Sequence, residues 1–285
     1  MKTITPTVAQ LRMLASIKGE TWMIRPDMVQ SFALSALEIG DHRAGSAEDD
    51  YLSNFYTKRI GAFMDGDGIA HIEVRGALLN KAPAIYEKWG LATTYNTIIN
   101  ESAAAKQHGA RGILYTFDSP GGTVSGVVEG GASIMDAGIP TAAFCSGLTC
   151  SAAYWLASGT GHITATPSAI VGNIGAIISW ADCSAFWEEM GVEFKALVSE
   201  GADLKSTFHL EPDEAQTEFL QDGINEAGAQ FRAHVQSGRT KAGTELNSEI
   251  WRAGWYSGAK AGNLGLVDDI GTLEDACKTL ISMIQ

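Results

Sequence analysis

The sequence contains few basic residues, and this shortage excludes a class of partners. There are 20 Lys and Arg against 33 Asp and Glu, so the net charge is −13 over 285 residues. Nucleic-acid binding needs a basic face, and docking on an anionic membrane surface needs a basic patch. We therefore expect no nucleic-acid partner and no attachment to anionic lipid.

Long hydrophobic runs are absent as well. No stretch reaches the roughly 18 consecutive apolar residues that a transmembrane helix needs. The N-terminal segment contains neither the apolar run nor the cleavage site of a signal peptide. We therefore expect no membrane anchor and no secretion signal.

Cysteine and proline are scarce, whereas glycine is abundant. The four cysteines, Cys145, Cys150, Cys183 and Cys277, form no C-x-x-C pair, and no histidine lies at zinc-site spacing from them. This pattern predicts reduced, buried thiols and no metal site, and nothing else in the sequence predicts a cofactor. The 7 prolines and 32 glycines exclude collagen or a proline-rich linker, and they indicate the tight turns of an α/β protein.

The hydrophobic pattern changes near residue 65. Before that point only Met28, Phe32, Leu34 and Leu37 show roughly helical spacing, after Pro26 as a plausible helix start. The stretch that follows is polar and acidic, without a clear period. We predict an N-terminal extension over residues 1–65, with one helix and a polar stretch, and a folded domain over residues 66–285.

Within the predicted domain, strand-like and helix-like segments alternate. Such alternation predicts βαβ units, and therefore an α/β fold with a parallel sheet and flanking helices. Strands are expected at 68–76, 112–118, 140–145 and 192–201, with two short ones within 162–180. Helices are expected at 93–110, 123–138, 151–159, 184–191, 211–239 and 272–284.

A glycine-rich segment follows the strand expected at 112–118. Its sequence is Ser119-Pro120-Gly121-Gly122, and two glycines allow the backbone to approach a ligand closely. With a helix expected from residue 123, free N–H groups at this point would suit an anion. The same residues also fit an ordinary turn between a strand and a helix.

Ser151 follows the next strand, at the start of the helix expected at 151–159. Its hydroxyl could act as a nucleophile, with the Ala152 N–H free to join an oxyanion hole, or it could only cap the helix. No histidine lies in a context that ties it to Ser151. Lys205 could serve as the base if burial lowered its pKa, although taken alone it also fits a surface lysine.

Five motifs in order resemble one known family. They are SPGG after a strand, Ser-Ala-Ala-Tyr before a helix, ATPSAIVGNIGA, a turn similar to Gly-x-x-Lys, and GLVDDIG, and together they span residues 68–273. This set is similar to the signal peptide peptidase A family of serine–lysine peptidases, which have the ClpP/crotonase fold. The N-terminal WMIRPDMVQSFALSAL segment and the absence of a membrane anchor make the chain most similar to the bacteriophage and prophage branch, the capsid-assembly (prohead) proteases.

The resemblance implies roles for the matching residues. Ser151 would be the nucleophile and Lys205 the general base. The N–H groups of Gly122 and Ala152 would form the oxyanion hole, with Gly121 beside them.

Three positions depart from the family pattern. Ala152 and Ala153 follow the serine where glycines are usual, and the turn from Gly201 to Lys205 is one residue longer than Gly-x-x-Lys. Asn173 stands where the family has a serine that orients the lysine. The Asn173 amide oxygen could accept a hydrogen bond from Lys205 in its place.

The family also implies a function. We expect a serine endopeptidase, without cofactor, that cleaves scaffold, portal or other head proteins during capsid maturation, as a homo-oligomer in the host cytoplasm or inside the prohead. A host-type peptidase that clears signal peptides, or a catalytically silent capsid-assembly factor, remains an alternative. An acyl-CoA enzyme of the same fold would need carboxylate acids, and a Clp-type subunit would need a histidine after ATPSA, where Val171-Gly-Asn173 offers none.

Overall fold

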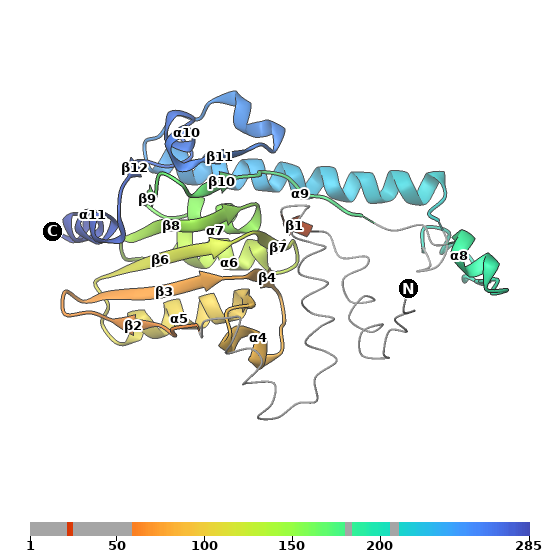
Figure 1. The fold of residues 1–285 in the computed structure, drawn as a ribbon, viewed down its shortest axis with the longest axis horizontal. Helices are drawn as coiled ribbons and strands as arrows, with labels where there is room; N and C mark the ends of the chain where they lie inside the picture. The colour runs from red at the N-terminus through yellow and green to blue at the C-terminus, as the bar shows by residue number, and fades with distance from the viewer. Residues whose placement is uncertain (1–21, 25–58, 180–183, 206–210) are drawn as a thin grey trace, which may run out of the picture.

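An eight-stranded mixed sheet forms the centre of the molecule (Figure 1). The computed structural model describes residues 22–24, 59–179, 184–205 and 211–285. The helix expected after Pro26, and Cys183, lie outside these ranges. The main strand order is β11-β10-β8-β6-β3-β2. The parallel strands of this order are β3 (Ile69–Arg75), β6 (Gly112–Ser119), β8 (Thr141–Cys150) and β10 (Ile170–Gly172).

Short strands complete the edges of this sheet. β2 (Phe63–Met64) and β11 (Trp255–Ser257) pair antiparallel with β3 and β10. β9 (His162–Ala165) pairs with the first half of β8, and β12 (Asp269–Ile270) pairs with β9, both in parallel. Because β2 belongs to the sheet, the division predicted near residue 65 falls just after an edge strand.

A second, four-stranded sheet has the order β1-β7-β4-β5. Its strands are β1 (Trp22–Ile24), β7 (Gly121–Thr123), β4 (Ala77–Leu79) and β5 (Ala92–Thr94). β4 lies between two parallel neighbours, and β1 is antiparallel to β7. The small sheet therefore connects the segment before the main domain to the end of β6.

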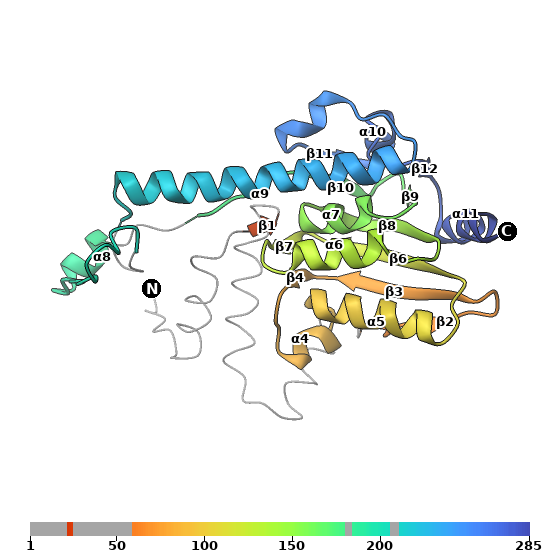
Figure 2. The ribbon, with the colours of Figure 1, turned by 180° about the vertical axis from the view of Figure 1, so that it is seen from behind.

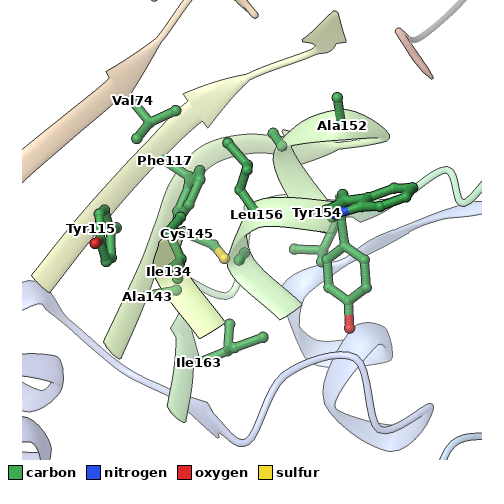
Figure 3. Close-up of a cluster of buried hydrophobic side chains, with 14 of the residues drawn as sticks. Val74, Tyr115, Phe117, Ile134, Ala143, Cys145, Ala152, Tyr154, Leu156 and Ile163 are labelled. Atoms are coloured by element: carbon green, nitrogen blue, oxygen red, sulfur yellow. The ribbon is translucent and has the colours of Figure 1, made fainter. Parts of the chain in front are cut away.

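Helices cover both faces of the large sheet. Alternate residues of β6 point to opposite faces, so that Tyr115 and Phe117 contribute to one core (Figure 3). Leu114 contributes to another core on the opposite face. The first core packs under α5 (Tyr95–Gln107), α6 (Val127–Met135) and α7 (Ala152–Ser158). The second packs under α11 (Leu273–Ile284). Burial on both faces explains why β6 is an almost unbroken apolar run.

The remaining helices lie around this core. They are α4 (Ala84–Lys88), α8 (Ser184–Glu189), α9 (Glu214–Lys241), α10 (Gly258–Asn263) and the 3-10 helix η1 (Ser248–Arg252). Asp213 starts α9 with a capping box, because its side chain accepts from the Gln216 N–H and the Gln216 side chain accepts from the Asp213 N–H. Thr272 starts α11 in the same way with Asp275. None of the helices in the described ranges is long and apolar enough to cross a membrane.

The long helix α9 is only half packed. From Ala227 onward it buries Phe231, Val235, Gly238 and Arg239, and it packs against α7. The part of α9 before Ala227 buries no residue and projects beyond the sheets, with α8 beside its N-terminal end (Figure 2).

The structure confirms the predicted α/β fold with a parallel sheet and flanking helices, but three local predictions were wrong. Residues 192–201 form no strand, because no partner strand pairs with them and the Leu197 side chain is fully exposed. Gly121–Thr123 are a strand, not the start of a helix, and α6 begins only at Val127. β8 continues to Cys150, beyond the expected end at residue 145, because its second half pairs with β10.

Candidate active site

Ser151 stands at a sharp turn between a strand and a helix. It follows the last residue of β8 and precedes the first residue of α7. Its N–H donates to the Gly172 carbonyl at 2.8 Å, and its own carbonyl accepts from the Trp155 N–H at 2.9 Å. These bonds hold Ser151 at φ 57° and ψ −124°. A positive φ in a residue with a side chain costs about 1–3 kcal/mol, and such strain is concentrated at functional sites.

The Ser151 hydroxyl is buried and unpaired. Only 1% of the residue is exposed, and Oγ has no hydrogen-bond partner among the described residues. It does not cap α7, so the capping interpretation of Ser151 is wrong. An unsatisfied buried polar group costs about 1–3 kcal/mol. The fold therefore keeps a strained, unpaired hydroxyl at a net cost in stability.

The glycine-rich segment lies beside this serine. Ser119, at the end of β6, is opposite Thr149, two residues before Ser151. Two residues after Ser119, β7 begins at Gly121, whose N–H donates to Ser119 Oγ at 3.2 Å. α7 packs against β7. The close approach of the two segments therefore follows from the pairing of β6 with β8.

Both glycines of β7 are required by geometry. Gly121 has φ 108°, a conformation that favours glycine. A Cβ on Gly122 would lie 1.7 Å from the Leu78 carbonyl oxygen of β4. These residues are not the expected start of a helix, because they belong to β7, which pairs with β1 on one edge and with β4 on the other.

Asn173 lies directly behind the Ser151 turn. It follows Gly172, the acceptor of the Ser151 N–H, and it has φ 59°. Its N–H donates to the Gly254 carbonyl at 2.7 Å, and its side-chain Nδ2 donates to the Ala253 carbonyl at 3.0 Å. Asn173 therefore fastens the end of β10 to the segment before β11.

Lys205 is exposed and belongs to the segment between α8 and α9. Its N–H donates to the Ala202 carbonyl, and the Asp203 carbonyl accepts from Gln216 Nε2 at 2.9 Å. This hydrogen bond ties the segment to the first turn of α9, which lies roughly 16 Å along the helix axis from Ala227. Since Ser151 Oγ has no partner, the structure does not join Ser151 and Lys205 by a hydrogen bond.

His234 is a titratable group near α7 that the sequence did not single out. It stacks against Trp155, one helical turn after Ser151, with ring centroids 4.8 Å apart. Burial lowers its pKa to about 4, against an opposing hydrogen bond with the Trp155 backbone. His234 is therefore neutral at pH 7, and it makes no hydrogen bond to Ser151, whose Oγ is unpaired.

Two thiols of β8 lie just before Ser151 in the chain. Cys145 and Cys150 on β8 are buried and form no disulfide with a described residue, and the Cys150 thiol donates to the Ile170 carbonyl at 3.5 Å. Burial raises the pKa of Cys145 to about 12, so it carries no thiolate at neutral pH. Among the residues that the structure describes, no group of three or more His, Cys, Asp or Glu could hold a metal ion.

Residues of the GLVDDIG motif, Gly265 to Gly271, bond to the helices and the strand around Ser151. Arg239 of α9 is fully buried and forms an ion pair with Asp268. Asp268 also accepts from the Ile163 N–H at 2.8 Å, and the Tyr154 hydroxyl donates to the Leu266 carbonyl at 2.8 Å. Burial would raise the pKa of Asp268, but the Arg239 guanidinium, the Ile163 N–H and the Thr244 hydroxyl hold this pKa below its usual range. The motif thus locks α7, α9 and β9 together.

A shallow cavity of about 480 Å³ opens next to Asn173. It is bounded by residues 174–176, by one face of α9 and by residues 251–253. Arg232 on α9 crosses this region and donates to the Trp251 carbonyl at 3.2 Å. The cavity is large enough to accept a side chain of a bound peptide.

Comparison with known proteins gives a consistent result. A sequence profile of peptidase family S49 matches residues 133–283. The chain is 30% identical over 259 residues to capsid assembly protease C of Escherichia phage lambda, covering 88% of this chain and 56% of that protein. It is 26% identical over 229 residues to head-tail preconnector protein GP5 of Enterobacteria phage P21, covering 76% and 44%.

A cellular relative matches over a shorter range. The chain is 31% identical over 175 residues to the putative signal peptide peptidase SppA of Enterococcus faecium, covering 60% of this chain and 50% of that protein. The chain thus spans about half the length of these curated relatives. A solved structure of the 1510-N membrane-bound stomatin-specific protease overlays with a TM-score of 0.46 and 16% identity, covering 73% of this chain and 77% of that one.

Proposed function

Because the chain belongs to peptidase family S49, we propose that it is a serine endopeptidase in which Ser151 is the nucleophile and Lys205 is the general base. The observation that carries the proposal is the Ser151 turn: a buried, unpaired hydroxyl on a strained backbone, next to the two glycines of β7. No ordinary structural role accounts for this hydroxyl, since it neither caps α7 nor bonds a neighbour.

The reaction would begin with attack of Ser151 Oγ on a peptide carbonyl. The neutral amine of Lys205 would take the hydroxyl proton, and it would later deliver that proton to the leaving amine. Water would then hydrolyse the acyl-enzyme. The N–H groups of Gly122 and Ala152 would donate to the tetrahedral oxyanion, and losing one such donor typically costs about 10²–10³ in rate.

The proposal requires Lys205 to move. In the structure the lysine is exposed, and a side-chain hydrogen bond from Gln216 to the Asp203 carbonyl ties its segment to the first turn of α9. Lys205 would reach Ser151 when substrate closes the site, and there it could donate to the Asn173 amide oxygen. Because Lys205 is already exposed, moving it would not uncover buried apolar side chains.

The relatives support a substrate class. Those named for capsid assembly and for the head-tail preconnector are phage proteins, and the match to the former covers 88% of this chain. We propose that the substrates are polypeptides of the phage head, such as scaffold or portal proteins, and that the active form is a homo-oligomer.

Two matched lysines provide the test. Wild type, Ser151→Ala, Lys205→Ala and Lys195→Ala would be incubated alone and with casein, and the products would be followed by intact-mass spectrometry. Lys195 is an exposed lysine of the same segment that pairs with the exposed Glu193, so Lys195→Ala should cut like wild type. Ser151→Ala and Lys205→Ala should both stop cleavage while the circular dichroism spectrum is unchanged. Cleavage near the wild-type rate in either variant would contradict the proposed dyad.

A second candidate is a catalytically silent capsid-assembly factor. The exposed position of Lys205, away from an unpaired Ser151, favours this alternative. A fluorophosphonate probe separates the two functions, because it labels an activated serine. If the probe labels Ser151 in wild type but not in Lys205→Ala, the assembly-factor candidate is excluded.

A further inference from the structure

The strand β1 comes from the segment that precedes the main domain, yet it pairs with β7. Trp22 is opposite Thr123, Met23 is opposite Gly122, and Ile24 is opposite Gly121, in antiparallel register (Figure 1). β4 occupies the other edge of β7. As the end strand of the small sheet, β1 is the element that covers the outer edge of β7.

The covered edge belongs to the proposed active site. Gly121 and Gly122 are brought beside Ser151 by the pairing of Ser119 with Thr149 and by the contact of α7 with β7. An extended peptide adds to an exposed strand edge through its backbone N–H and C=O groups. An extended substrate that reaches Ser151 along β7 would therefore pair with the outer edge of this strand, which β1 occupies.

The attachment of β1 is short enough to be reversed. It consists of three residue pairs. Loss of one backbone hydrogen bond changes an equilibrium by about 2- to 12-fold. Three residue pairs can therefore keep β1 on the edge of β7 in the absence of substrate. A peptide that makes a longer strand or fills a neighbouring cavity can still displace β1.

We propose that Trp22–Ile24 is an intramolecular occupant of the peptide-binding edge of β7, and that it keeps the protease at low activity until it is displaced. The inference rests on the proposed peptidase function of Ser151. It adds that the chain carries its own competitor for the edge at which an extended peptide would pair with β7.

A register-specific disulfide in the full-length chain tests the occupancy. Residues opposite each other on antiparallel strands have Cα atoms about 4.5–5.5 Å apart, within the range of a disulfide, whereas diagonal neighbours lie beyond it. Trp22→Cys/Thr123→Cys should therefore form a cross-link under mild oxidation. The matched pair Ile24→Cys/Thr123→Cys is out of register by two residues and should not. Peptide mapping by mass spectrometry identifies the bond among the native cysteines.

The cross-linked protein then tests the inhibition. Labelling of Ser151 by a fluorophosphonate probe and cleavage of casein should be lost in the oxidised Trp22→Cys/Thr123→Cys protein and should return when the disulfide is reduced. The proposal is overturned if the folded double variant forms no cross-link, or if the cross-linked protein labels and cuts at the reduced rate. If neither wild type nor any variant is labelled or cleaves casein, the proposed peptidase function and the proposed inhibition both fail. The cross-link would then still show whether β1 occupies the edge of β7.

A proline variant tests the same contact in the opposite direction. Met23→Pro removes an N–H from the centre of β1 and is incompatible with a paired strand interior, whereas Met23→Ala keeps the backbone unchanged. We expect Met23→Pro to raise the probe-labelling rate by about 2- to 12-fold over Met23→Ala, the range for one backbone hydrogen bond. Equal rates in the two variants would show that β1 does not restrain the site.

Discussion

Ser151 and Ser158 are two buried serines of one short segment. Replacing each with alanine should change the free energy of unfolding in opposite directions. Ser151 precedes α7 and Ser158 ends it, and both are almost fully buried. Ser158 Oγ donates to the Trp155 carbonyl at 2.8 Å, whereas Ser151 Oγ has no partner among the described residues. The change to alanine therefore removes a satisfied hydroxyl at one site and an unsatisfied one at the other.

The magnitudes follow from these contacts. Ser151→Ala removes a desolvated hydroxyl that costs about 1–3 kcal/mol, so the free energy of unfolding should rise by up to that amount. Ser158→Ala loses a hydrogen bond, and the free energy of unfolding should fall by about 0.5–1.5 kcal/mol. Ser151→Gly would also release the positive-φ strain of about 1–3 kcal/mol, less the roughly 0.5–1 kcal/mol entropic cost of glycine.

Urea denaturation followed by circular dichroism would measure both effects. In a thermal scan each kcal/mol corresponds to about 2–4 °C for a domain of 150–250 residues. Ser151→Ala should thus melt above wild type and Ser158→Ala below it. If both variants are destabilised, the Ser151 hydroxyl is paired in solution and the reasoning from its isolation is wrong.

Three further predictions concern the supports of the site. Asp268→Ala should lower the free energy of unfolding by about 3–5 kcal/mol, because it leaves the buried Arg239 charge unpaired. The control Asp269→Ala removes a partly exposed contact with His162 and should change the free energy of unfolding by under about 1 kcal/mol. Urea titrations measure both values. Since the pKa of Asp268 is held below its usual value, its contribution to stability is complete above about pH 4 and is lost as pH falls through the folded pKa; Asp268→Asn should flatten this acid limb of a stability–pH curve. Gly122→Ala places a Cβ against the β4 backbone and should reduce probe labelling of Ser151 by about 10²-fold or more. The control is Gly223→Ala in the exposed part of α9, where a Cβ contacts no other atom, and this variant should label like wild type.

The exposed Lys205 and the occupied edge of β7 suggest one resting state. Ser151 Oγ is buried and has no hydrogen-bond partner among the described residues, and Trp22–Ile24 pairs with β7, the strand proposed to receive substrate. A peptide that displaces β1 would occupy the edge of β7 and close the site over Ser151. Binding of substrate and assembly of the dyad would then be the same event, which restricts cleavage to polypeptides that make a full strand.

Local patterns were sufficient for most helices and for the central strands. The continuous apolar run of β6 and the helix caps at Asp213 and Thr272 depend on residues that are close in the sequence, so a local pattern is enough to predict them. The segment 192–201 shows the limit of this reasoning. Its apolar residues predict a strand, but a strand needs a partner, and the fold provides none there.

The sequence by itself determined the α/β architecture and, through the order of its motifs, singled out Ser151 and the two glycines of β7. Tertiary structure alone decided their chemical state. The hydrogen bond from Ser151 to Gly172 strains the turn, and the approach of β4 excludes any side chain at Gly122. The pairing of β1 with β7 joins residues that are about a hundred positions apart. Such contacts depend on elements distant in the chain, and therefore no local pattern records them.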